Sequence, residues 1–151
     1  MSDKYMMPEN EISDKMWRIY SAAIQSYLSI FVHIRKVESI FGVELFDYYD
    51  ATLTCLQVII FGCLDLEKVL VPLTGMELKY EQDIARFENR KPNTMHYVYI
   101  RKNKEYDYDA VDDTLFGVMS DNARLIIDEE EELEDVSDQC AREFYNKIKE
   151  W

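Results

Sequence analysis

The chain contains few turn-forming residues: only four Gly and three Pro among its 151 residues. This scarcity favours a handful of long elements over many short strands. It also excludes a glycine-rich phosphate-binding loop, because the four glycines, at positions 42, 62, 75 and 117, lie too far apart to form one. We therefore expect no nucleotide-binding motif and no cofactor.

Cysteine and histidine are scarce as well, with three and two residues. Cys55 and Cys63 lie in the most apolar stretch of the chain, where a free thiol behaves as a small hydrophobic side chain. We expect them to be reduced core residues, as in a cytoplasmic protein, rather than members of a disulfide or metal site. His33 and His96 have no clustered Cys partners with which to bind zinc.

Long hydrophobic runs are missing from the sequence too. The longest uncharged stretches, residues 19–34 and 51–64, are shorter than the ~18 apolar residues that a membrane span requires. The N-terminus has neither the basic start nor the apolar run of a signal peptide. The sequence therefore predicts a cytoplasmic protein without a membrane partner.

Basic residues are nearly absent from one part of the chain. Between Glu105 and Asp138 there are fourteen acidic residues and one base, Arg124, so this window carries the whole net charge of −13. A field of one sign attracts partners of the opposite sign and repels nucleic acid and anionic membranes. The window thus points to a basic protein as partner and argues against direct binding of nucleic acid.

Apolar residues spaced three and four apart predict five helices. These cover about residues 11–41, 49–70, 74–91, 112–126 and 129–149. Pro72 ends the second helix, and a capping box of Thr74 and Glu77 opens the third, with Tyr80, Ile84 and Phe87 facing inward. Asp112 or Asp113 caps the fourth. The fifth begins with residues 129–132, because the helix dipole favours acid in a first turn.

Two groups of tyrosines border a polar link and predict a β-hairpin near residues 96–109. Tyr97 and Tyr99 precede the four-residue link 101–104, and Tyr106 and Tyr108 follow it. We therefore predict a mostly-α fold, a five-helix bundle-like single domain with this hairpin. The domain spans residues 10–151, after a flexible lead at residues 1–9.

The acidic window has a simple alternative role as a solvated face that keeps the protein soluble. Its near lack of compensating bases distinguishes it from ordinary surfaces, on which both signs are interspersed. As one extended helical face it would span about 51 Å, or one net charge per roughly 4 Å. That density is close to the 3.4 Å spacing of a single phosphate strand, though not to that of a duplex.

Four carboxylates inside the window, Asp107, Asp109, Asp112 and Asp113, could be taken for a calcium loop. The pattern D-x-[DN]-x-[DN]-G fails, because Val111 occupies the third ligand position and no Gly follows. We therefore expect no dedicated metal site.

The segment from Arg90 to His96 resembles the R-x(4–6)-H motif of the HEPN ribonucleases, a family of small helical domains. The resemblance implies that His96 would act on the ribose hydroxyl or the leaving oxygen, and that Arg90 would stabilise phosphate charge. This chemistry needs an acid–base group that titrates near neutrality beside a permanent cation. Pro92 departs from the pattern, because it breaks the helix that presents both side chains in the family.

We interpret the chain as a non-enzymatic, acidic interaction protein that blocks a basic surface of a nuclease or other nucleic-acid-handling effector. It would act as an inhibitor and nucleic-acid mimic, in an anti-defence role, or as an immunity or antitoxin partner. The alternatives are the small ribonuclease and a helical structural subunit that forms a homodimer. The residues expected to contact the basic partner are Asp107, Asp109, Asp112, Asp113, Glu129, Glu130, Glu131, Glu132, Glu134, Asp135, Asp138, Tyr106 and Tyr108.

Overall fold

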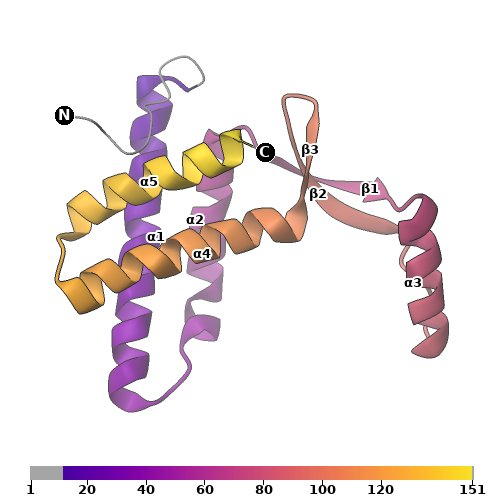
Figure 1. Ribbon diagram of the computed structural model, residues 1–151, viewed down its shortest axis with the longest axis horizontal. Helices are drawn as coiled ribbons and strands as arrows, with labels where there is room; N and C mark the ends of the chain where they lie inside the picture. The colour runs from indigo at the N-terminus through magenta and orange to yellow at the C-terminus, as the bar shows by residue number, and fades with distance from the viewer. Residues whose placement is uncertain (1–11, 151) are drawn as a thin grey trace.

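The computed structural model describes residues 12–150, which form five helices and one three-stranded sheet (Figure 1). The elements in chain order are α1 (Asp14–Phe41), α2 (Phe46–Cys63), β1 (Glu67–Pro72), α3 (Gly75–Phe87), β2 (Met95–Arg101), β3 (Lys104–Asp107), α4 (Tyr108–Glu129) and α5 (Leu133–Lys149). The predicted fold class is confirmed: the protein is mostly α-helical and contains a β-hairpin.

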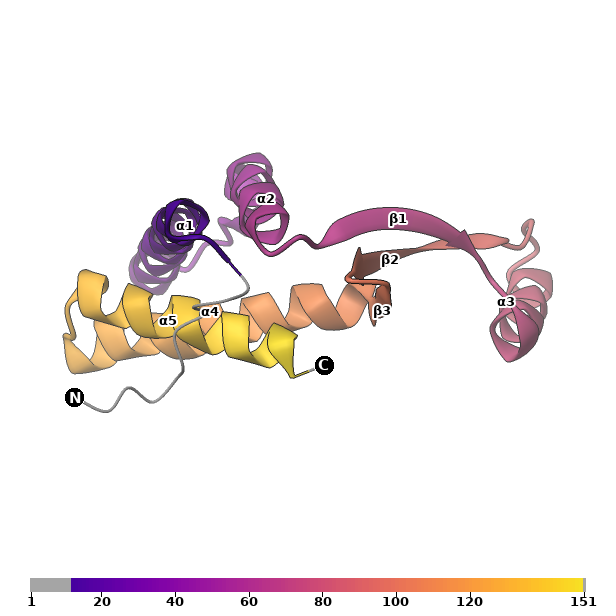
Figure 2. The same cartoon turned by 90° about the horizontal axis from the view of Figure 1, so that it is seen from above.

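Four helices form the body of the protein in two layers, with the α4–α5 pair laid across α1 and α2 (Figures 1 and 2). The central helix is α1, which contacts the other three. Its fully buried Tyr20 donates a hydrogen bond from its hydroxyl to the carbonyl oxygen of Ala141 in α5 at 2.6 Å. This bond satisfies a buried polar group and ties the two layers together.

The ends of α1 follow the expected capping rules. The Oγ of Ser13 accepts a hydrogen bond from the backbone N–H of Met16, and Gly42 closes the helix with φ at 64°. Glycine is favoured at such a left-handed position because it has no Cβ.

The second helix ends earlier than its apolar pattern predicts. It stops at Cys63, and residues predicted to complete it form strand β1 instead. Asp65 takes a left-handed backbone conformation, with φ at 56°, which breaks the helix. β-Branched Val69 and Val71 then suit the extended chain.

The prediction for Cys55 was also wrong, because this residue is exposed on α2, whereas Cys63 is buried.

The sheet is antiparallel with the strand order β1-β2-β3. The hairpin between β2 and β3 is confirmed, but its link contains two residues, not four. Lys102 and Asn103 both have positive φ, at 52° and 62°, and this geometry matches the right-handed twist of the flanking strands. The pairing of β1 with β2, from Glu67 opposite Ile100 to Pro72 opposite Met95, was not predicted.

The strands β1 and β2 form an arm that extends away from the body and holds α3 at its far end (Figure 2). Over the described range, α3 has no extensive contact with any other helix. The prediction that Tyr80 and Phe87 face inward is therefore wrong, since both are exposed. Thr74 is the N-cap of α3 as predicted, but its side chain makes no capping hydrogen bond.

The last two helices begin at other residues than the sequence suggests. Asp107, not Asp112 or Asp113, caps α4, and its Oδ1 accepts from the N–H of Ala110 at 2.9 Å. The final helix begins at Leu133. Residues 129–132 therefore lie at the end of α4 and in the turn to α5, and not in the first turn of α5 as predicted.

Candidate functional site

The fold places twelve of the fourteen acidic residues of the window in two groups at opposite ends of α4, with Glu105 on β3 and Asp121 within α4 outside both groups. Because α4 has 22 residues, its ends lie about 33 Å apart. The sheet-end cluster stands at the start of α4 and consists of Asp107, Asp109, Asp112 and Asp113. The turn cluster surrounds the connection to α5 and consists of Asp128, Glu129, Glu130, Glu131, Glu132, Glu134, Asp135 and Asp138. The window therefore doubles back and is not one extended face.

The sheet-end cluster has a structural explanation. Asp107 caps α4, and Asp109 lies in the first turn, where the helix dipole stabilises a negative charge. The Oδ1 of Asp112 accepts hydrogen bonds from Nε2 of Gln57 at 2.9 Å and from the hydroxyl of Tyr99 at 3.2 Å. Partial burial raises the pKa of Asp112, and the bond from Tyr99 opposes that shift. Asp107, Asp109 and Asp112 therefore help to build the fold.

The turn cluster has such an explanation only in part, because Glu134 and Asp135 lie in the first turn of α5, where the helix dipole stabilises a negative charge as it does for Asp109. The cluster as a whole places eight carboxylates within eleven residues, and no Lys or Arg occurs from residue 125 to residue 141. All eight residues are exposed. In the part of the chain that the structure describes, the cluster makes one ion pair, from Nε of Arg142 to Oδ2 of Asp138 at 3.0 Å.

Two members of the turn cluster stand where acid is unfavourable for folding. Glu129 is the last residue of α4, where the dipole of the helix repels a negative charge. Glu130 follows in a left-handed conformation, with φ at 55°. That conformation favours Gly or Asn and costs a residue with a Cβ about 1 kcal/mol or more. Both residues therefore reduce the stability of the helix end that they occupy.

The tyrosines beside the sheet-end cluster are engaged within the protein. Tyr106 is buried, and Tyr108 stacks on Tyr99 with ring centroids 5.2 Å apart. Lys68 of β1 lies over two neighbouring rings, with its Nζ 4.4 Å from the centroid of Tyr97 and 4.8 Å from that of Tyr108. Each such contact at an exposed site contributes about 0.5–1 kcal/mol. Neither Tyr106 nor Tyr108 therefore presents a free ring to a partner.

The same residues border a pocket of about 330 Å³ between α2 and the sheet. Gln57 and Phe61 line it from α2, and Lys68, Tyr99 and Tyr108 line it from the other side. Neither Gln57 nor Lys68 was predicted from the sequence to belong to a site. No local signal could have identified Lys68, because its role depends on the pairing of β1 with β2.

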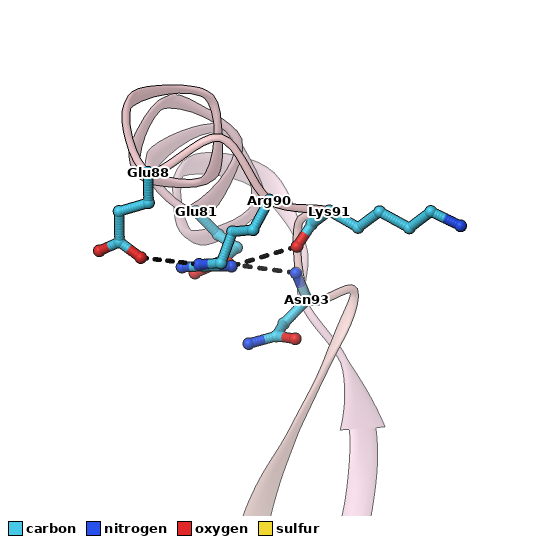
Figure 3. Close-up of polar contacts among 5 residues, drawn as sticks. All are labelled: Glu81, Glu88, Arg90, Lys91 and Asn93. Atoms are coloured by element: carbon cyan, nitrogen blue, oxygen red, sulfur yellow. Dashed lines mark hydrogen bonds and ion pairs between the residues drawn. The ribbon is translucent and has the colours of Figure 1, made fainter.

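Arg90 and His96 belong to different elements and have separate partners. Arg90 follows α3, where its guanidinium contacts the carboxylates of Glu81 and Glu88 and donates to the carbonyl of Lys91 (Figure 3). This pairing lowers the pKa of Glu81, which also accepts from the N–H of Asn93. His96 lies on β2, with its Nε2 3.8 Å from Oε2 of Glu77. Arg90 thus fastens the end of α3 to the loop that follows.

Comparison of the chain with protein-family models, curated proteins and solved structures finds no match. Across residues 12–150, no three His, Cys, Asp or Glu side chains gather in a way that could hold a metal ion. None of the helices described is long and apolar enough to span a membrane. The turn cluster, defined by its charge and exposure, is the strongest candidate site.

Proposed function

We propose that this protein is an acidic interaction protein whose turn cluster binds a basic surface of a nucleic-acid-handling protein. The observation that supports this proposal is the placement of Glu129 and Glu130. Selection for stability alone favours neither residue at the C-terminal end of α4, because the dipole and the left-handed backbone both disfavour them. Residues that reduce stability at an exposed position are typical of functional sites.

The charge density of the turn cluster fits a partner that binds phosphates. Along a single nucleic-acid strand, eight charges would span about 27 Å. The cluster holds eight carboxylates in one helical turn, a short connection and the last residues of α4, so its density equals or exceeds that of a strand. The negative charge of the cluster would therefore attract a phosphate-binding basic groove about as strongly as a nucleic-acid strand does. Competition with nucleic acid for this groove is the proposed mechanism.

The test compares three forms of the full chain. The first is wild type, and the second combines Glu130→Gln, Glu131→Gln, Glu134→Gln and Asp135→Asn. The matched control combines Glu105→Gln, Asp109→Asn, Asp113→Asn and Asp121→Asn, which change the net charge by the same amount at exposed positions elsewhere. Each form is immobilised, incubated with lysate of the native host and eluted with rising salt.

We expect wild type and the matched control to capture a nucleic-acid-binding protein. The turn-cluster variant should fail to capture it. Mass spectrometry of each eluate measures this difference. Equal capture by all three forms would show that the turn cluster is only a solvated surface.

A further inference from the structure

A second surface of the molecule is apolar and uncovered. On α3, Met76, Tyr80 and Phe87 are 85%, 70% and 93% exposed, and no other described residue covers them. At 100° per residue these three side chains and Ile84 project within one arc of about 80°. An amphipathic helix normally buries such a stripe against a neighbour. Here the arm carries the stripe away from the body (Figure 2).

The body carries a second uncovered apolar stripe, on the outer face of α2. Tyr48 and Val58 are 82% and 66% exposed, and Cys55 and Ile59 are also exposed. Tyr48, Cys55 and Ile59 follow one another at heptad spacing, which aligns them along one side of the helix. This side explains why α2 is apolar almost all round although only Leu53, Ile60, Phe61 and Cys63 are buried.

The two stripes match in length. Tyr48 and Ile59 are eleven positions apart, and so are Met76 and Phe87. Both stripes therefore extend about 16 Å along their helices. Helices that pack together bring their axes to about 8–10 Å, so contact along this length would cover both sets of side chains.

The arm that carries α3 is less acidic than the body. Residues 67–100 have five Lys or Arg and five Asp or Glu, a net charge of zero. Residues 42–66, which include α2, have four acidic residues and no base, a net charge of −4. The body of another copy therefore does not repel the arm, whereas it repels the acidic residues 105–138.

We infer that two copies of the chain form a twofold dimer joined by their arms. In this dimer α3 of each copy packs on the outer face of α2 of the other copy. Such a reciprocal contact closes on itself and leaves no stripe uncovered. Aromatic side chains bury about 150–250 Å² each, so Tyr80 and Phe87 of both copies contribute about 600–1,000 Å². With a similar area from the facing α2 surfaces, the total reaches the 1,200–2,000 Å² of a stable interface.

Sedimentation analysis of the full chain tests this inference. Wild type is expected to sediment at twice its chain mass of 18.0 kDa. The double variant Tyr80→Glu/Phe87→Glu should raise the dissociation constant of the dimer by about 100-fold or more, because it places charge in the apolar contact. The control Gln82→Glu adds one negative charge at an exposed α3 position outside the stripe and should remain dimeric.

Cross-linking then identifies the contact. In the variant Tyr80→Cys, a bismaleimide reagent should join the new thiol to the native Cys55 of the other copy, and Cys55→Ser should abolish the product. Circular dichroism checks that each variant stays folded, which is expected because α3 packs on no other helix in the described chain. A wild type that sediments as a monomer well above micromolar concentration, or a cross-link that does not depend on Cys55, would overturn the inference.

Discussion

The backbone N–H of Glu130 donates to the carbonyl oxygen of Leu125 and closes α4 with Glu130 in the left-handed conformation. This bond satisfies one of the unpaired carbonyls that every helix end leaves. The residue that makes it is nevertheless unsuited to its position in both backbone preference and charge. The backbone of this turn therefore serves folding, whereas the side chain of Glu130 does not.

Replacement of Glu130 by Gly is expected to raise the free energy of unfolding by about 1 kcal/mol, because Gly removes the backbone strain and the unfavourable charge. Glu130→Gln should recover only the smaller electrostatic part. Urea denaturation measures both. The matched control is Gly42→Ala at the other left-handed helix end, where φ is 64° and a Cβ would meet no atom within 4 Å. It should lower stability by a similar amount, and a destabilised Glu130→Gly would contradict this account of the turn.

Asp112 offers a second test, because its two hydrogen bonds need an acceptor and not a charge. Asp112→Asn keeps an oxygen for Gln57 and Tyr99 and should equal or exceed wild type in stability at neutral pH. Asp112→Ala leaves both donors unpaired and should cost about 1–3 kcal/mol.

The pH dependence of this difference has a defined sign. Burial raises the pKa of Asp112 in the folded protein, so the protonated form is favoured by folding. Its contribution to stability is fully present below the unfolded pKa of about 3.9 and is lost as pH rises through the folded pKa. The advantage of Asp112→Asn over wild type should therefore shrink as pH falls towards about 4. An advantage that grows on acidification, measured by urea denaturation, would contradict this prediction.

The sequence predicted the helices of the body well where their apolar residues continued over many turns. It could not place the end of α2, because the apolar spacing runs through Leu66 and Leu70 into β1. The break at Asp65 depends on a backbone conformation that leaves no mark in the hydrophobic pattern. For α3, the stripe of Tyr80, Ile84 and Phe87 showed which face is apolar but not that nothing in the described chain covers it.

The acidic composition of the candidate site was predicted from the sequence, but the positions of its carboxylates in the fold were not. The excess of acid between Glu105 and Asp138 is visible by counting. Its division into two clusters follows from the cap at Asp107 and from the turn at residues 130–132, which set the length of α4. With four possible Asp caps within seven residues, spacing alone could not choose the one that begins the helix.

Association of the turn cluster with its partner is expected to weaken steeply with salt. Exposed charges are screened over about 8 Å at physiological ionic strength, and all eight carboxylates are exposed. Titration of the captured partner at several salt concentrations measures the slope. An affinity that stays constant from low to high salt would mean an apolar contact and would direct attention to the uncovered stripes of α2 and α3.

Labelled RNA incubated with the purified protein is expected to remain intact. Glu81 and Glu88 engage the guanidinium of Arg90, and His96 lies on a strand beside Glu77. The acidic body also opposes the approach of a polyanion. His96→Ala serves as the comparison. Cleavage by wild type that disappears in this variant would support the ribonuclease alternative instead.

The central claim is that the turn cluster competes with nucleic acid for a basic surface. The measurement that tests it most directly is the displacement of fluorescently labelled DNA from the captured partner, followed by anisotropy as this protein is added. Wild type and the variant with Glu105→Gln, Asp109→Asn, Asp113→Asn and Asp121→Asn should release the DNA at similar concentrations. The variant with Glu130→Gln, Glu131→Gln, Glu134→Gln and Asp135→Asn should require at least about tenfold more, equivalent to 1.4 kcal/mol. DNA that stays bound at saturating wild type, or release at one concentration by all three forms, would contradict the claim.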